Sequence, residues 1–302
     1  MEKHTAADAA HQQMSPDAML AQARGLRQDS KHEQALALLR RLESSDRLEA
    51  WLMRADSAFE IGQHALQSAL LEESITAWQH CLRLLPAHAS SEERARLQCG
   101  LADALFVLGG CEPGAERLLA AVAAYRDALQ HCSLRRAPLQ WGLIHYNLGA
   151  ALCILGVREA DPALLEQAVA AYQAALEGYR RESAARDWAA TQHSLGNVLQ
   201  ALGSAHPSDT LRLEQAVAAY RAALEEYSRE QAPMAWATTQ NNLGGALYVW
   251  ALRQPKRSLL EQAEAAYRAA AGVFHKQREK DGFDGATANA LQVRKLLEQW
   301  KA

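Results

Sequence analysis

An internal repeat of 47 residues constrains the fold of this 302-residue chain more than any other feature of its sequence. The segment LEQAVAAY occurs at residues 165–172 and again at 213–220, and LEQAEAAY follows at 260–267. Weaker copies, LLAAVAAY and LEESITAW, stand at 118–125 and 71–78. The aromatic residues that close these segments are separated by 47 or 48 residues: Trp78, Tyr125, Tyr172, Tyr220 and Tyr267.

We call a set of like residues that recurs with this period a ladder. The aromatic residues above form one ladder, and three further ladders share its period. The first contains Gly62, Gly109, Gly156 and Gly203. The second contains Leu101, Leu148, Leu195 and Leu243, each followed by Ala or Gly, and the third contains Trp141, Trp188 and Trp236. Four ladders with one period indicate about five copies of one structural unit. A length of 302 residues would otherwise suggest about two globular domains, whereas stacked repeats form one elongated domain.

Each copy has the pattern of two helices. Leu165, Ala168, Val169 and Tyr172 recur at spacings of three and four residues, as on the apolar face of a helix. The preceding segment shows the same period from Trp188 to Leu202 in the next copy. All eight prolines lie at expected helix boundaries, where a missing N–H costs little. We therefore expect an all-α protein of about 12–13 helices.

The ends of the chain differ from its middle. Residues 1–15 are polar and are expected to form a flexible tail, and residues 16–46 a short helix pair. Residues 47–282 hold the five long repeats, and residues 283–302 read as a C-terminal capping helix with a polar outer face. Residues 16–302 are thus expected to form a single solenoid.

The repeat resembles the tetratricopeptide repeat (TPR). Its characteristic residues appear here as Trp188, Leu195-Gly196, Gly203, Ala216, Tyr220 and Ala223. The family period is 34, so each unit carries 13 extra residues, placed in the turn between the helices and in a longer second helix. The stretch WATTQNNLG at 236–244 is similar to long-period bacterial repeats, and its paired asparagines are similar to those of kinesin light-chain repeats.

The resemblance implies a right-handed superhelical solenoid of antiparallel helix pairs. First helices would line a concave groove and second helices a convex wall. Counting three residues before, one after and four after the small residue of each first helix selects the groove face. From these positions, and from Arg96 one turn earlier, we select the predicted partner-binding residues. They are Arg96, Asp103, Phe106, Tyr146, His193, Asn197, Gln200, Asn241 and Tyr248.

The chemistry of these residues suits binding of a peptide or a protein domain. Asn197, Gln200 and Asn241 can donate and accept hydrogen bonds, and resemblance to peptide-binding members implies that such amides hold an extended peptide backbone. Phe106, Tyr146 and Tyr248 could line side-chain pockets. The alternative is that the amides bond to neighbouring helices or water. Asn147 and Asn242 point sideways and are expected to bond between helices.

No motif of catalysis or cofactor binding is present. The sequence lacks a Walker loop, GxGxxG, HExxH and a nucleophile elbow. A His193–Cys153 pair, or a metal site of His145, His193 and Asp103, has no spacing that recommends it. The five cysteines form no CxxC pair and are expected to be buried, reduced thiols. We therefore predict no catalytic residue, no metal and no cofactor.

Charge and hydropathy exclude two kinds of partner. A net charge of −3 with no basic groove argues against nucleic acid. No apolar run approaches a membrane span of about 18 residues, and no signal peptide begins the chain, so a cytoplasmic location is expected. The most economical function is a non-enzymatic protein-interaction adaptor. A self-associating scaffold (a homo-oligomer) and a regulatory subunit of a separate catalytic chain remain alternatives.

Overall fold

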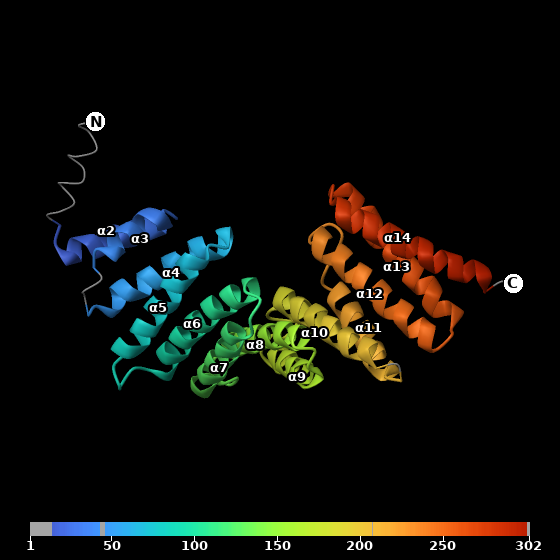
Figure 1. Ribbon diagram of the computed structural model, residues 1–302, viewed down its shortest axis with the longest axis horizontal. Coiled ribbons are helices and arrows are strands. Elements are labelled where there is room, and N and C mark those ends of the chain that lie inside the picture. The colour runs from blue at the N-terminus through green and yellow to red at the C-terminus, as the bar shows by residue number, and fades with distance from the viewer. Residues whose placement is uncertain (1–13, 43–45, 207, 301–302) are drawn as a thin grey trace. The chain divides into compact units, whose positions relative to one another are not determined.

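Helices account for all the regular structure that the computed structural model describes. It describes residues 14–42, 46–206 and 208–300, which form thirteen α-helices and no strand (Figure 1). The all-α prediction of 12–13 helices is therefore confirmed. The chain divides into two compact units, residues 1–133 and 134–302. A single solenoid over residues 16–302 stays a prediction, and each unit is described by itself.

The first unit contains six described helices. They are α2 (Pro16–Gln28), α3 (His32–Arg40), α4 (Leu48–Ala65), α5 (Ser68–Leu84), α6 (Ser91–Cys111) and α7 (Glu116–His131). Each helix packs against the next one in the chain. The prediction of a shorter first pair agrees with the lengths of α2 and α3, which have 13 and 9 residues.

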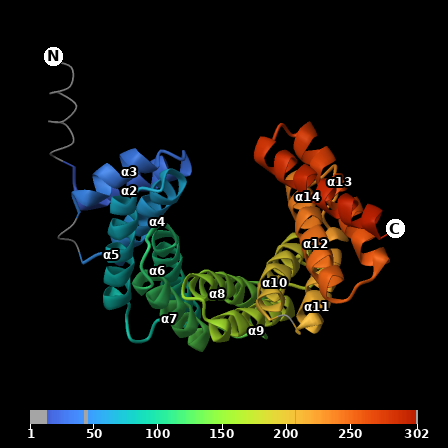
Figure 2. The same ribbon diagram turned by 45° about the vertical axis from the view of Figure 1, so that its right-hand side comes forward.

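The second unit contains seven described helices. They are α8 (Pro138–Arg158), α9 (Pro162–Gly178), α10 (Ala185–Ala205), α11 (Thr210–Leu224), α12 (Pro233–Arg253), α13 (Arg257–Lys276) and α14 (Lys280–Gln299). Here too, each helix packs against its successor, as the paired ribbons of Figure 2 show. The first helices also contact one another, α8 with α10, α10 with α12, and α12 with α14.

Glycine lets each second helix approach its first helix closely. A methyl group added at Gly196 would come within 2.7 Å of the Tyr220 ring, and one at Gly244 within 2.9 Å of the Tyr267 ring. Such distances are shorter than van der Waals contact, so a side chain at the glycine would displace the ring. The glycine and tyrosine ladders are therefore two halves of one contact, repeated along the second unit.

Proline residues mark the beginning of several helices, as the sequence predicts. Pro16, Pro138, Pro162 and Pro233 each occupy the first turn of a helix. Proline suits this position because its fixed φ is helical and its missing N–H would have no partner there. Pro207 lies outside the described residues.

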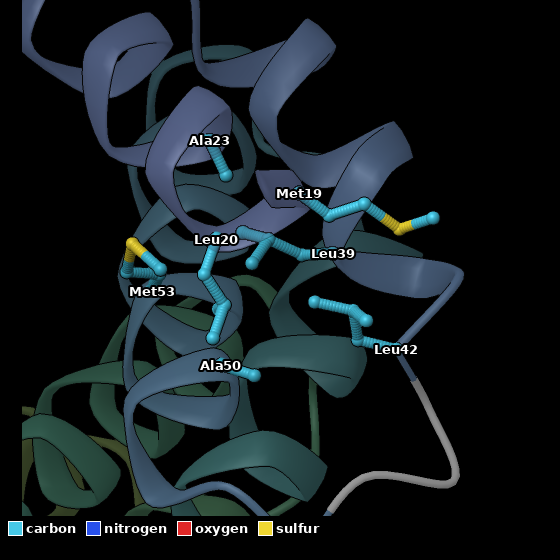
Figure 3. Packing of buried hydrophobic residues seen from close by; sticks show 7 residues of the cluster. All are labelled: Met19, Leu20, Ala23, Leu39, Leu42, Ala50 and Met53. Atoms are coloured by element: carbon cyan, nitrogen blue, oxygen red, sulfur yellow. The ribbon is translucent and has the colours of Figure 1, made fainter. Parts of the chain in front are cut away.

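A small apolar cluster closes the N-terminal end of the first unit (Figure 3). Met19, Leu20 and Ala23 of α2 pack with residues of the α3 end and of α4. The members from the later segments are Leu39, Leu42, Ala50 and Met53. This burial explains why two short helices, which would be marginal alone, are ordered here.

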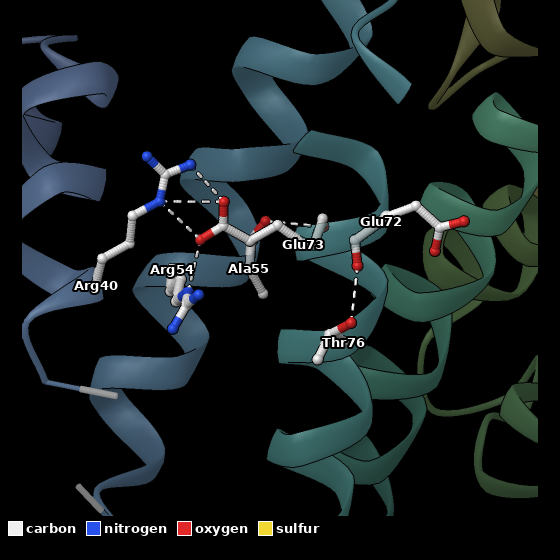
Figure 4. Close-up of polar contacts among 7 residues, drawn as sticks. Arg40, Arg54, Ala55, Glu72, Glu73 and Thr76 are labelled. Atoms are coloured by element: carbon white, nitrogen blue, oxygen red, sulfur yellow. Dashed lines mark hydrogen bonds and ion pairs between the residues drawn. The ribbon is translucent and has the colours of Figure 1, made fainter. Parts of the chain in front are cut away.

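A charged cluster joins α3, α4 and α5 (Figure 4). Glu73 of α5 accepts hydrogen bonds from Arg54 Nε at 2.7 Å and from Arg40 Nη2 at 2.5 Å. The side chains of Arg54 and Glu73 are only 11% and 13% exposed. Burial raises the pKa of Glu73, but the hydrogen bonds from the two arginines outweigh it and hold the pKa below its usual value.

The cysteines are less uniformly buried than the sequence suggested. Cys81 and Cys132 are buried, Cys99 and Cys153 are half-buried, and Cys111 is exposed, all as free thiols. The prediction is wrong for Cys111, which is the last residue of α6 and is exposed. Among the described residues, no helix has the length and apolar character needed to cross a membrane.

Candidate interaction surface

Six of the nine predicted binding residues lie on the first helices of the second unit. Tyr146 is on α8, His193, Asn197 and Gln200 are on α10, and Asn241 and Tyr248 are on α12. Since these three helices contact one another in that order, their corresponding faces form one surface. We call it the first-helix face, and define it by these six residues and their helical neighbours on the same side.

Hydrogen bonds across the first helices hold this face together. Nδ1 of His193 on α10 lies 2.8 Å from Oγ1 of Thr239 on α12. The amide of Asn242 on α12 donates to Oδ1 of Asn197 on α10 over 2.9 Å. Asn242 thus bonds between helices, as expected from its sideways position. The face is pre-organised by its own polar contacts rather than being a set of independent side chains.

The two amides on α10 are engaged by the tyrosine ladder. Oη of Tyr220 on α11 lies 2.8 Å from Oδ1 of Asn197 and 2.8 Å from Oε1 of Gln200. A phenol has one proton, so it can fully donate to one of these oxygens at a time. With Oδ1 of Asn197 occupied by Asn242 and Tyr220, the exposed amide of Asn197 has its N–H groups left for a partner. The oxygen atoms of both amides thus bond to neighbouring helices, as the alternative interpretation of the sequence expects.

His193 presents a hydrogen-bond acceptor to the same face. The Thr239 hydroxyl donates to the carbonyl of Ala235 over 2.7 Å, so it accepts from Nδ1–H of His193. In a neutral imidazole, Nε2 is then an acceptor. Burial lowers the pKa of His193, which keeps the ring neutral near pH 7.

The two predicted binding residues on α12, Asn241 and Tyr248, differ in their hydrogen-bond partners. Oδ1 of Asn241 is shielded from solvent and has no hydrogen-bond partner in the described residues. Oη of Tyr248 accepts a hydrogen bond over 2.8 Å from the amide of Gln292 on α14. Tyr146, on the opposite side of the face, packs edge-on against Tyr172, with 5.7 Å between ring centroids.

The remaining three predicted residues lie on α6 of the first unit. Asp103 accepts a hydrogen bond from the Tyr125 hydroxyl over 2.6 Å, which repeats the tyrosine contact seen at Asn197. Arg96 is exposed and Phe106 is half-buried. The same ladder position thus carries a carboxylate on α6, Asp103, and an amide on α10, Asn197.

Sequence reasoning missed the apolar ends of the first-helix face. Leu139 and Val157 of α8 and Leu252 of α12 are 53%, 62% and 56% exposed. They continue the groove spacing by one or two helical turns beyond the positions counted in the sequence. Carrying the same count to the ends of each helix would have found them.

The titratable thiol and imidazole groups near this face belong to Cys153, His145 and His193. No group of three His, Cys, Asp or Glu side chains in the part of the chain that the structure describes is placed to hold a metal ion. Burial raises the pKa of the Cys153 thiol, so thiolate is disfavoured. His145 has neither ring nitrogen hydrogen-bonded and packs on Trp141, with 4.4 Å between ring centroids. Burial lowers the pKa of His145 to about 4.

Comparison with known proteins identifies the fold. No protein-family model matches the sequence, and no curated protein matches it. BtubC (BKLC) from P. vanneervenii is a similar solved structure, with 18% identity, a TM-score of 0.51, and coverage of 83% of this chain and 91% of that one. The C-terminal part of a TPR repeat-containing protein from Cytophaga hutchinsonii is also similar, with 13% identity, a TM-score of 0.50, and coverage of 91% and 95%. The chain therefore has a TPR-like helical-repeat fold.

Proposed function

We propose that the chain is a non-enzymatic protein-interaction adaptor that receives a segment of a partner protein on the first-helix face of its second unit. The observation that carries the proposal is a pre-organised surface with polar groups left over. Nε2 of His193 and the amide N–H groups of Asn197 remain after the internal bonds are counted. Such groups fix the register of a bound segment, while aromatic neighbours supply contact area.

The TPR-like fold supports this proposal by analogy, because function lies in the surface that a repeat array presents. Binding energy would come from apolar and aromatic contacts with Tyr146 and Tyr248. The polar groups of α10 would supply specificity, since a partner that left them unpaired would lose affinity. The face does not need a cofactor for this role.

Blocking the face with a bulky cation tests the proposal. Thr238 is exposed on α12, one turn before Asn241, and Gln215 is exposed on α11, a second helix of the same unit. Wild-type protein, Thr238→Arg and Gln215→Arg would each be used to capture proteins from the native cell extract, with quantitative mass spectrometry as the readout. The proposal expects partners that are retained by wild type and Gln215→Arg but reduced at least tenfold by Thr238→Arg. Equal retention by both variants would overturn it.

A further inference from the structure

Two first helices of the second unit follow an arginine that stacks on their tryptophan. The guanidinium carbon of Arg181 lies 5.4 Å from the ring centroid of Trp188 on α10. That of Arg229 lies 4.3 Å from the ring centroid of Trp236 on α12. The two arginines are 48 residues apart, and so are the two tryptophans. Arg181 and Arg229 therefore occupy one position of successive repeats, where a cation is held over an aromatic ring.

The chain itself supplies carboxylates to Arg181. Nη1 of Arg181 donates a hydrogen bond to Oε2 of Glu225 over 2.5 Å, and Nε donates one to Oε1 of Glu226. These adjacent glutamates follow the last residue of α11 and stand five and six residues after Tyr220. The position of Arg181 in the repeat is therefore suited to binding two carboxylates that are neighbours in sequence.

Glutamates are missing from the corresponding positions beside Arg229. Five and six residues after Tyr267, on α13, the sequence has Gly272 and Val273. Arg229 forms no hydrogen bond or ion pair with any residue that the structure describes. A methyl group added at Gly272 would meet nothing within 4 Å, so the place of the first carboxylate is open space. The pair of α12 and α13 thus repeats the arginine without its anions.

A pocket lies at this open place, between α13 and the residues that precede and begin α12. We call it the α13 pocket. Its volume is about 760 Å³, and Arg229, Arg268 and Lys276 line it. Lys276 has no hydrogen bond or ion pair within the described ranges. Arg268 lies 4.0 Å from an oxygen of Glu264 that Arg294 contacts at 2.7 Å. Three cations thus line the pocket with little of their charge neutralised by the chain.

The α13 pocket is electropositive, although the chain has a net charge of −3. Among the described residues that line it, Glu230 is the one carboxylate against the three cations. Residues 265–278, which include all the lining residues from α13, contain no Asp or Glu. Such a local excess of positive charge attracts an anionic partner and opposes a cationic one.

We propose that the α13 pocket binds two adjacent carboxylates of an acidic segment of a partner protein. The contacts of Arg181 are the template, because they show which groups satisfy an arginine at this position of the repeat. Arg268 and Lys276 add the attraction that a separate molecule needs, since one exposed ion pair contributes little. The described residues that line the pocket include none of the six that define the first-helix face. The pocket is therefore a second contact site, additional to the function proposed above.

The test uses a phage-displayed library of random 12-residue peptides, selected on the full chain and counter-selected on Gly272→Glu. This variant puts a carboxylate at the position that Glu225 has one repeat earlier, and so supplies an anion to Arg229 from within the chain. Gly272 is exposed with open space beside it, so the variant should fold, which circular dichroism checks. We expect enriched peptides to carry adjacent Asp or Glu residues, and their binding to weaken as the NaCl concentration increases.

Matched variants locate the binding of the synthesised peptides, with fluorescence anisotropy as the measure of affinity. Gly272→Glu should weaken binding at least tenfold, and Gly272→Gln, which has the same length without the charge, less than threefold. Arg229→Gln should weaken binding at least fivefold. Arg181→Gln removes an arginine that is already paired within the chain, so it should change binding less than twofold. Glu230→Gln should strengthen binding, because it removes a charge of the same sign as the peptide.

Three outcomes would overturn this proposal. Enriched peptides that are neutral or basic, or no enriched peptide, would rule out an acidic segment. Equal losses from Arg229→Gln and Arg181→Gln would show that the peptides bind elsewhere. Tenfold tighter binding of a peptide with phosphoserine in place of one acidic residue would make phosphate, rather than carboxylate, the group that the pocket takes. The first-helix face is tested separately by Thr238→Arg, so the failure of either proposal leaves the other unaffected.

Discussion

The hydroxyl of Tyr220 lies 2.8 Å from Oδ1 of Asn197, and this contact joins the repeat ladder to the candidate binding surface. Tyr220 is fully buried between helices, whereas Asn197 is exposed. The ring crosses the gap over Gly196 and its polar tip reaches the first-helix face. One side chain therefore both packs the repeat and orients an amide on the surface.

Tyr220→Phe should lower the free energy of unfolding by about 1 kcal/mol, because it removes one net hydrogen bond while keeping the ring. Urea denaturation followed by circular dichroism measures the change. Tyr267→Phe is the matched control, since the Tyr267 hydroxyl has no hydrogen bond within the described residues. Equal losses in the two variants would show that the contacts of the Tyr220 hydroxyl with Asn197 and Gln200 contribute nothing.

Gly196→Ala and Gly272→Ala should have opposite effects on stability. At Gly196 the new methyl group would meet the Tyr220 ring at 2.7 Å, and such overpacking costs about 1–3 kcal/mol. At Gly272, inside α13, a methyl group would have nothing within 4 Å, so the higher helix propensity of alanine should stabilise by about 0.5–1 kcal/mol. Thermal unfolding of both variants checks the signs, and a stabilised Gly196→Ala would contradict the ring contact.

Glu73→Gln should destabilise the first unit by about 1–3 kcal/mol, because it removes the carboxylate that pairs with Arg54 in a poorly hydrated position. The low pKa of Glu73 means that its stabilising charge is present above the ordinary carboxyl pKa and is lost as pH falls through the lowered value. Glu166→Gln, which breaks the exposed Arg212 pair, should change stability by less than about 1 kcal/mol. Chemical denaturation at pH 7 compares the two, and similar losses would contradict the role of burial.

His145 should make the chain less stable in mild acid. Because burial lowers its pKa to about 4, the unfolded chain takes up a proton below its ordinary pKa of about 6.5 while the folded chain does not. Stability from this group is complete above pH 6.5 and is lost between pH 6.5 and 4. His145→Gln, the residue found one repeat later at Gln192, should reduce the difference between denaturation midpoints at pH 7.5 and 5.0. An unchanged difference would mean that His145 is hydrated.

The structure changes how the amides of the groove should be tested. Asn197→Ala removes an acceptor of the Tyr220 proton as well as a surface amide. The double variant Asn197→Ala with Asn241→Ala should therefore lose both partner binding and some stability. Affinity measured well below the unfolding temperature separates the two effects, and unchanged affinity would remove the amides from the proposed site.

The sequence predicts where most residues of the candidate surface lie because the surface repeats. The 47-residue spacing puts Tyr146, His193 and Asn241 at one register of successive first helices, and the structure brings those helices together. The partners of each side chain could not be placed. That Oδ1 of Asn197 accepts a hydrogen bond from Tyr220 depends on how α10 packs against α11, and no residue pattern carries that information.

The sequence by itself determined the helices, their period and the face on which each residue lies, because helical spacing and proline placement are local properties. Tertiary structure alone decided which polar groups on that face remain free. It used Oδ1 of Asn197 internally, shielded Oδ1 of Asn241, and left Leu139, Leu143 and Val157 of α8 exposed. The physical reason is that hydrogen-bond saturation and exposure depend on contacts between residues about 45 positions apart, which exist only after the helices pack.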